Sequence, residues 1–174
     1  SNASDALDKL YYKALTEHLS DVSREELGID LALDKEARLL IIRDNGIGMT
    51  KEELENNLGV IARSGSRAFR QDMGKDENGG DVDIIGQFGF YSAFMVSDKV
   101  TVESRAYGAD EAFRWESEGA DGYTVDPCDK PDRGTTITLH IKAKTEDEDT
   151  DEFLEPYRIQ GIVKKYSDYI RYPI

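Results

Sequence analysis

Apolar residues recur at helical spacing in the first segment of the chain. Five of them fall in one stripe: Leu7, Leu10, Tyr11, Ala14 and Leu15. The polar residues Asn2, Asp5 and Lys9 lie at positions i, i+3 and i+7, on the opposite side. The spacing therefore predicts an amphipathic helix with a buried stripe and a separate polar face.

In the next segment apolar residues recur at every second position instead. Ile29, Leu31 and Leu33 alternate with polar or small residues, a polar turn occupies residues 34–37, and residues 39–42 form an uninterrupted apolar run. Alternation is typical of a half-buried strand, and an uninterrupted run favours a strand covered on both faces. This segment is therefore predicted to be a β-hairpin.

A second helix is predicted after the hairpin. Thr50 followed by Glu53 fits a capping box, and the helix would carry Leu54, Leu58 and Ile61 inward. From about residue 63 to 86 the periodicity ends in a mixture of Gly, Ser, Asp and Arg. Because long irregular segments inside a compact domain are usually functional, we interpret residues 63–86 as a lid.

The second half of the chain is rich in predicted strands. Their ranges are 99–104, 112–116, 123–125 and 135–141. An acidic run then precedes a last predicted helix, which would bury Ile159, Ile162, Val163 and Tyr166. The layout predicts a single α+β domain over residues 1–174, a two-layer sandwich in which helices cover one face of a mostly antiparallel sheet.

Composition narrows the classes of function. The chain has 174 residues, a net charge of −14 and one cysteine. Acidity spread along the chain argues against a broad nucleic-acid surface, and no apolar run approaches the length of a membrane span. A single cysteine excludes an intrachain disulfide and makes a reducing compartment such as the cytoplasm the expected location.

The strongest local motif is Asp44-Asn45-Gly46-Ile47-Gly48-Met49, directly after the apolar run. An ionised carboxylate only accepts hydrogen bonds, so Asp44 suits an exocyclic amine such as that of adenine. The glycines allow positive φ and close approach of the backbone to a ligand. The alternative is a plain turn between a strand and a helix, for which these residue types are also typical.

Three further features are candidates for phosphate or metal binding. Asn2 offers an uncharged oxygen that suits Mg²⁺, and Lys9 could reach a phosphate, although such a helix face is often only solvated. The glycines of segment 86–90 precede a predicted short helix and could cradle a phosphate or form a hinge. Thr135, after Gly134, opens a strand and is also a common strand former.

Taken together, these motifs resemble the N-terminal ATP-binding domain of the heat-shock-protein-90 chaperones, within the wider group of gyrase, histidine-kinase and mismatch-repair ATPases. The resemblance covers nearly the whole chain. The Asp-x-Gly-x-Gly element at 44–48 is common to the wider group, whereas segments 61–66 and 91–98 are similar to the chaperones in particular. It implies binding of ATP or ADP with Mg²⁺, client proteins as partners, and a homodimeric full-length protein with middle and dimerisation domains.

The resemblance also implies roles for individual residues. Asn2 would be the Mg²⁺ ligand, with Asp5 and Lys9 lining the site, and Asp44 would bind the adenine amine. Gly48, Met49 and Thr135 would shape the base pocket. The ribose and phosphates would be flanked by Asn57, Leu58 and Phe90, next to Gly89 of the phosphate loop. Arg63 and Ser64 would lie at the hinge of the lid, which closes over bound ATP and promotes dimerisation.

The chain departs from the family pattern at two places. The family's general base is a glutamate four residues before the asparagine, upstream of Ser1, and the family's first strand and helix are not in this sequence. Gly89 is followed directly by Phe90, so two residues of the phosphate loop, including its third glycine, are missing. Since a positioned general base contributes ~10²–10⁴-fold, we expect this chain to bind ADP-like ligands and to hydrolyse ATP poorly.

Other functions on the same fold stay open from the sequence. A histidine kinase would need a phosphoacceptor histidine on a helix, and neither His18 nor His140 has that setting. A topoisomerase ATP domain would be expected to continue into a DNA-handling region. A binding module that is gated by nucleotide without catalysis is the alternative from another class.

Overall fold

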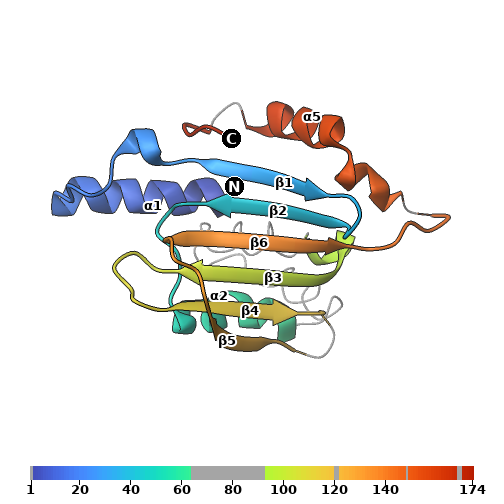
Figure 1. Ribbon diagram of the computed structural model, residues 1–174, viewed down its shortest axis with the longest axis horizontal. Helices are drawn as coiled ribbons and strands as arrows, with labels where there is room; N and C mark the ends of the chain where they lie inside the picture. Colours follow the sequence, from blue (N-terminus) through green and yellow to red (C-terminus); the bar gives the residue numbers. More distant parts are fainter. Residues whose placement is uncertain (1, 64–92, 120–121, 148, 168–169) are drawn as a thin grey trace, which may run out of the picture.

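The computed structural model describes residues 2–63, 93–119, 122–147, 149–167 and 170–174. Within these residues the strands form one six-stranded sheet in the order β1-β2-β6-β3-β4-β5 (Figure 1). The strands are β1 (Ile29–Asp34), β2 (Leu39–Asp44), β3 (Ser97–Arg105), β4 (Ala112–Ser117), β5 (Thr124–Cys128) and β6 (Gly134–Ile141). Each neighbouring pair is antiparallel, so the predicted sheet is confirmed.

Two long helices lie on one face of this sheet (Figure 1). Helix α1 (Asn2–Glu17) runs behind β1 and β2, and α2 (Lys51–Arg63) runs behind β3 and β4. Helix α5 (Pro156–Tyr166) lies beyond the edge strand β1 and is preceded by the short 3-10 helix η2 (Thr150–Leu154). A second 3-10 helix, η1 (Arg24–Glu26), connects α1 to β1. The predicted two-layer α+β sandwich is therefore confirmed.

Each long helix has its own core against the sheet. The α1 core is formed by Leu7, Leu10, Ala14, Val22, Leu27, Ile29 and Tyr172. The α2 core is formed by Leu40, Leu54, Leu58, Val100, Val102, Trp115, Leu139, Ile141 and Leu154. At the end of β2, the start of β6 and the end of β3, polar side chains replace the apolar ones on the helix-facing side of the sheet, and they form the candidate site described below.

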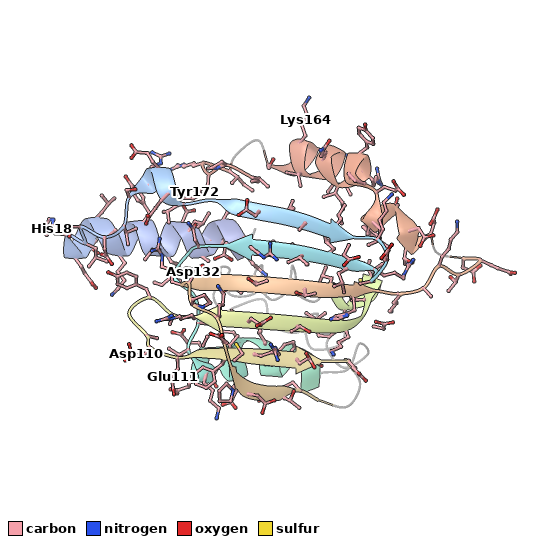
Figure 2. All side chains as sticks on the ribbon, viewed as in Figure 1. His18, Asp110, Glu111, Asp132, Lys164 and Tyr172 are labelled. Atoms are coloured by element: carbon pink, nitrogen blue, oxygen red, sulfur yellow. The ribbon has the colours of Figure 1, made fainter. Side chains whose placement is uncertain are left out.

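The C-terminal residues return to the start of the chain and close the α1 core. The hydroxyl of Tyr172 donates to Asp8 of α1 at 2.7 Å, and the carbonyl of Pro173 accepts from the Ile29 N–H at 2.9 Å. Figure 2 shows Tyr172 close to the segment that joins α1 to β1. The last residues of the chain thus hold α1 against the sheet.

The predicted capping box is confirmed in both directions. The Glu53 N–H donates to the Thr50 hydroxyl at 3.2 Å, and the Thr50 N–H donates to the Glu53 carboxylate at 2.9 Å. Two donors that the first turn of a helix leaves unpaired are thereby satisfied. This local interaction fixes where α2 begins, directly after the motif that ends at Met49.

Two packing predictions from the hydrophobic pattern are wrong. Leu15 does not join the buried stripe of α1 and is 57% exposed, because α1 extends past the sheet at that end. The apolar run of β2 is not covered on both faces: Leu40 is buried and Ile42 packs half-buried against the α1 core on the helix side, while Leu39 and Ile41 on the opposite face are half-buried with no helix over them. The helices lie on one face, so a β2 residue that points away from them has no second layer to contact.

One further packing prediction is only partly met: Ile159, Ile162 and Val163 of α5 are half-buried rather than buried, because α5 lies beyond the edge strand β1, and the side chain of Tyr166 lies outside the described residues. Trp115 is fully buried in the α2 core, and it stacks on Tyr123 with ring centroids 5.8 Å apart. The predicted lid lies outside the described residues from residue 64 onward. Within the described residues, every helix is too short or too polar to cross a membrane.

Candidate functional site

Three polar side chains lie side by side between α1 and α2. Asp44 ends β2, Thr135 lies near the start of β6, and Ser104 lies near the end of β3. Thr135 is paired with Asp44 on one side and with Ser104 on the other, so the three side chains point to the same face of the sheet. We call this set the polar rung. Its members are 9%, 5% and 0% exposed, respectively.

The Asp44 carboxylate is held by backbone donors. The Gly46 N–H donates to Asp44 Oδ1 at 2.9 Å, and the Thr135 N–H is a second backbone donor. Burial raises the pKa of Asp44 from 3.8 to about 6, against the opposing effects of these N–H groups and of the positive charge of Lys130. At neutral pH the carboxylate is therefore ionised, and keeping this charge buried costs free energy. A ligand that donates a hydrogen bond to the carboxylate would recover part of that free energy.

The loop after Asp44 packs directly on α1. The Ile47 N–H donates to the Ala6 carbonyl at 3.1 Å, and a Cβ on Gly46 would be 2.6 Å from the Ala6 carbonyl carbon. Glycine at 46 is thus required by the close approach of a helix backbone rather than by positive φ. This contact brings the N-terminal half of α1, with its polar face, next to Asp44.

The second glycine of the motif packs on β3. Gly48 has φ +66°, and a Cβ at this position would be 2.0 Å from the Arg105 carbonyl oxygen. A side chain here would meet both backbone strain and a steric clash with backbone atoms. The glycine therefore lets the loop close onto the end of β3 and places Met49 beside Ser104.

Ser104 belongs to this group of polar side chains and was not predicted from the sequence. Its hydroxyl accepts from the Met49 N–H at 2.8 Å, lies 2.8 Å from the Thr135 hydroxyl and is 3.2 Å from the Gly134 carbonyl oxygen. It therefore connects Met49 and Thr135, which were predicted to shape the base pocket, with Gly134, the residue before Thr135. A signal was available, because Ser104 continues the inward-facing alternation of Val100 and Val102 with a polar side chain.

Asn45 supports the loop from outside the site. Its side-chain oxygen accepts from the Gly28 N–H at 2.9 Å, and its amide donates to the Glu26 carbonyl at 2.6 Å. The Arg133 guanidinium donates to the Asn45 carbonyl at 3.0 Å and pairs with Glu26 at 2.7 Å. The asparagine of the motif thus anchors the loop to η1, and the aspartate beside it faces the ligand side.

The other predicted site residues are placed as follows. On α1, Asn2 is half-buried and Asp5 and Lys9 are exposed. On α2, Asn57 is exposed and its amide nitrogen is 3.9 Å from the Met49 sulfur, whereas Leu58 is buried in the α2 core. The Arg63 side chain and the residues Ser64, Gly89 and Phe90 lie outside the described residues.

The α1 face offers oxygen ligands for a metal ion. Asn2 and Asp5 are one turn apart, and a hard cation such as Mg²⁺ prefers oxygen donors. In the part of the chain that the structure describes, no cluster of three histidine, cysteine or acidic side chains is close enough to hold a metal alone. These residues fit an ion that keeps several waters and takes its remaining ligands from phosphate, which is the usual mode for Mg²⁺.

A hollow beside this site is lined by the loops 106–111 and 129–133, which contact the 45–48 loop through Tyr107 and Arg133. Figure 2 shows Asp110 and Asp132 on these loops, at one end of the sheet. Both arginines of the hollow are already engaged: Arg105 donates to the carbonyls of Ala109 and Pro131, at 2.8 and 2.6 Å, and Arg133 donates to the carbonyl of Asn45, at 3.0 Å. Its polar groups thus hold the two loops together, and the polar rung is the better candidate for a ligand.

The histidines and the cysteine do not form a catalytic centre. His18 follows the last turn of α1, far from the polar rung (Figure 2), and His140 is on β6, with its ring 3.4 Å from the Thr101 hydroxyl. Burial, together with the charge of Glu103, raises the pKa of the Cys128 thiol, which disfavours a reactive thiolate. None of these three residues is therefore a candidate catalytic group.

Comparison with known proteins gives consistent matches. Residues 14–129 match the family described as histidine kinase-, DNA gyrase B-, and HSP90-like ATPase. The chain is 63% identical over 176 residues to chaperone protein HtpG of Bacillus velezensis. It is 57% identical to that of Shouchella clausii and 58% identical to that of Bacillus subtilis. Each match covers 100% of this chain and 28% of the relative, so the chain spans less than a third of the length of these proteins.

Proposed function

Because the chain belongs to the histidine kinase-, DNA gyrase B- and HSP90-like ATPase family, we propose that it is the adenine-nucleotide-binding domain of a bacterial HSP90-type chaperone. The observation that carries this proposal is the buried Asp44 carboxylate, which faces the strip between α1 and α2. Its backbone donors leave it able to accept a further hydrogen bond from a ligand. An exocyclic amine of adenine is such a donor.

The adenine would lie against the polar rung. Asp44 would accept from its amine, while Gly48, Met49 and Thr135 would form the wall of the base pocket. Support comes from the bond between the Met49 N–H and Ser104, which ties this wall to the sheet. A rigid wall suits a planar base, because little side-chain entropy is lost on binding.

The ribose and phosphates would extend from the base toward the two helices. Asn57 and Leu58 would flank them from α2, and Phe90, Gly89, Arg63 and Ser64 would complete the site, with residues 63–86 as its lid. The contact of Asn57 with Met49 supports this direction, because Met49 is one of the residues that would form the wall of the base pocket. Asn2 would bind Mg²⁺ on the phosphates, with Asp5 and Lys9 beside it.

For the full-length protein we propose ATP hydrolysis, a homodimer with middle and dimerisation domains, and client proteins as partners. The family match and the HtpG relatives support this assignment, and the bacterial cytoplasm is the compartment that we propose. For the present chain the proposal is nucleotide binding. The poor hydrolysis expected from the sequence is a separate proposal, which a longer chain with the upstream glutamate would test by its ATPase rate.

Isothermal titration calorimetry with ADP tests the proposal directly. We expect one ADP-binding site per chain with Mg²⁺ present. An inhibitor that occupies the adenine site should compete with ADP and lower its apparent affinity. Guanosine diphosphate is the control, since its base presents an oxygen where adenine has an amine. Equal affinity for the two nucleotides would contradict the assignment of the polar rung to adenine.

The affinity for ADP is expected to fall as the pH is lowered through about 6. Burial raises the pKa of Asp44 to about 6. Only the ionised carboxylate has two oxygens that both accept, so either of them can bond to the amine. Below that pH each further unit should weaken binding by up to about tenfold, because the protonated fraction competes with the ligand. Titrations between pH 5 and 8 would measure the effect. A flat profile would show that Asp44 does not bind the base.

Replacing Asn2 with alanine is expected to remove the Mg²⁺ contribution to binding. The affinity for ADP with Mg²⁺ should fall by about tenfold, the cost of one lost charge-assisted contact, and the affinity with EDTA should not change. Thr16→Ala is the matched control, since Thr16 is exposed at the other end of α1 and bonds only to α1 carbonyls. If Asn2→Ala weakens the binding of ADP equally with Mg²⁺ and with EDTA, Asn2 is not a Mg²⁺ ligand.

A further inference from the structure

One peptide unit in the loop after Asp44 is held on both of its sides. Its N–H, which belongs to Gly46, donates to Asp44 Oδ1 at 2.9 Å. Its carbonyl, which belongs to Asn45, accepts from the Arg133 Nε at 3.0 Å. Because a trans peptide is planar and its C=O and N–H point in opposite directions, a partner that fixes the carbonyl also fixes the N–H. Arg133 therefore holds this N–H toward the carboxylate.

Arg133 is itself held by a closed ring of three residues. Its Nη2 pairs with the Glu26 carboxylate at 2.7 Å, and the Glu26 carbonyl accepts from the Asn45 side-chain amide at 2.6 Å. The bond from Arg133 to the Asn45 carbonyl closes the ring. The Arg133 side chain is only 24% exposed, and the planar guanidinium presents its two bonding nitrogens in fixed directions. The guanidinium is thus directed at the peptide before any ligand binds.

The backbone beside Arg133 brings it this close to the loop. Gly134 has φ +106°, and a Cβ at this position would be 2.1 Å from the Asp44 carbonyl oxygen and 2.8 Å from the Asn45 Cα. Glycine therefore lets the start of β6 contact the backbone of Asp44 and Asn45. A side chain at 134 would separate the two segments and move Arg133 away from the peptide.

The bond from Arg133 also affects the strength of the bond to Asp44. A hydrogen bond at the carbonyl of a peptide polarises the N–H at its other end and strengthens the bond that this N–H donates. Asp44 is buried, so its ionised form is stabilised by backbone N–H groups rather than by water. A donor that points firmly at the carboxylate therefore keeps it both charged and oriented.

We propose that Arg133 is a positioning residue of the nucleotide site, acting on Asp44 through the peptide that follows Asn45. Without the guanidinium this peptide is free to rotate, and Asp44 loses a donor that orients its carboxylate. The inference rests on the proposed function, because it takes Asp44 as the group that binds the ligand. The effect on Asp44 itself can be measured without nucleotide.

The test is an NMR titration of the Asp44 carboxyl in the nucleotide-free chain, with Asp44→Asn used to identify its signal. In the unmodified chain the midpoint should lie at the pKa of about 6. Arg133→Met should move the midpoint upward by about one pH unit, because the Gly46 N–H that favours the ionised form is lost. Arg133→Lys should give most of the same rise, since its single ammonium can pair with Glu26 without bonding to the Asn45 carbonyl. The weakening of ADP binding on acidification should begin at a correspondingly higher pH.

Arg114→Met is the matched control, because Arg114 also pairs with a glutamate, Glu103, but lies on the sheet face away from the helices. It should leave the midpoint unchanged. A rise with Arg133→Met but none with Arg133→Lys would show an effect of charge alone, like that of Lys130, and would overturn the inference. Variants at 133 that melt earlier but keep the midpoint would show a purely structural role and overturn it too, leaving the proposed function intact. Failure of the unmodified chain to bind ADP would overturn the proposed function and the inference together.

Discussion

Replacing Asp44 with asparagine is expected to abolish measurable adenine-nucleotide binding while leaving the protein at least as stable as before. An asparagine keeps one oxygen, whose two lone pairs can accept from the Gly46 N–H and the Thr135 N–H, the two backbone donors to Asp44. Its amide NH₂ would then face the amine of adenine, donor against donor. The loss of a hydrogen bond to a charged group, with a mismatch in its place, should weaken binding by about 100-fold or more.

The stability change follows from the direction of the pKa shift. The folded-state pKa of Asp44 is about 6 and thus above the ordinary value of 3.8, so this carboxyl stabilises the nucleotide-free fold when protonated, and that contribution is lost as the pH rises through about 6. At pH 7 the asparagine variant has no buried charge at this position. Its free energy of unfolding should therefore be higher by up to about 3 kcal/mol.

Urea denaturation and ADP titration at pH 7 would measure the two effects. Asp30→Asn is the matched control, since Asp30 is an exposed carboxylate on β1 and should change neither quantity by much. A variant at 44 that loses both binding and stability would show that the carboxylate serves the fold. A variant that keeps tight binding would remove Asp44 from the site.

Replacing Gly48 with alanine is expected to destabilise the chain far more than the same change at Gly108. Both glycines have positive φ, +66° and +76°, so the backbone strain of an alanine is similar, about 1–2 kcal/mol. A Cβ at 48 would be 2.0 Å from the Arg105 carbonyl oxygen, whereas a Cβ at 108 would have no atom within 4 Å. The clash should raise the cost at 48 to about 4 kcal/mol or more.

Urea denaturation of the two variants would separate strain from crowding. The variant at 48 should also lose ADP affinity, because moving the loop away from Arg105 pulls Met49 away from Ser104. The variant at 108 should bind ADP normally. Equal destabilisation at the two positions would show that close approach of the loop to β3 is not what glycine provides at 48.

The elements that the sequence predicted correctly depend on neighbours along the chain. The capping box of Thr50 and Glu53 acts over three residues, and the alternation of Ile29, Leu31 and Leu33 indicates a strand wherever its partners lie. The family resemblance was also correct, because the motif at 44–48 and the segments around it are matched by the HSP90-like ATPase family over residues 14–129. Such local signals suffice for the order of helices and strands.

The sequence by itself also determined that Asp44 and two glycines come at the end of an apolar strand, and it predicted that this group binds adenine. Only the tertiary structure decided which side chains complete the group. Ser104 is 60 positions beyond Asp44 and meets Thr135 because β6 lies between β2 and β3. Gly46 needs its small size because Ala6, from the start of the chain, packs against it. Leu15 stays exposed because α1 extends past the sheet. Spacing along the chain reports the local backbone, whereas these contacts depend on how distant segments pack, and that packing also raises the pKa of Asp44 to about 6.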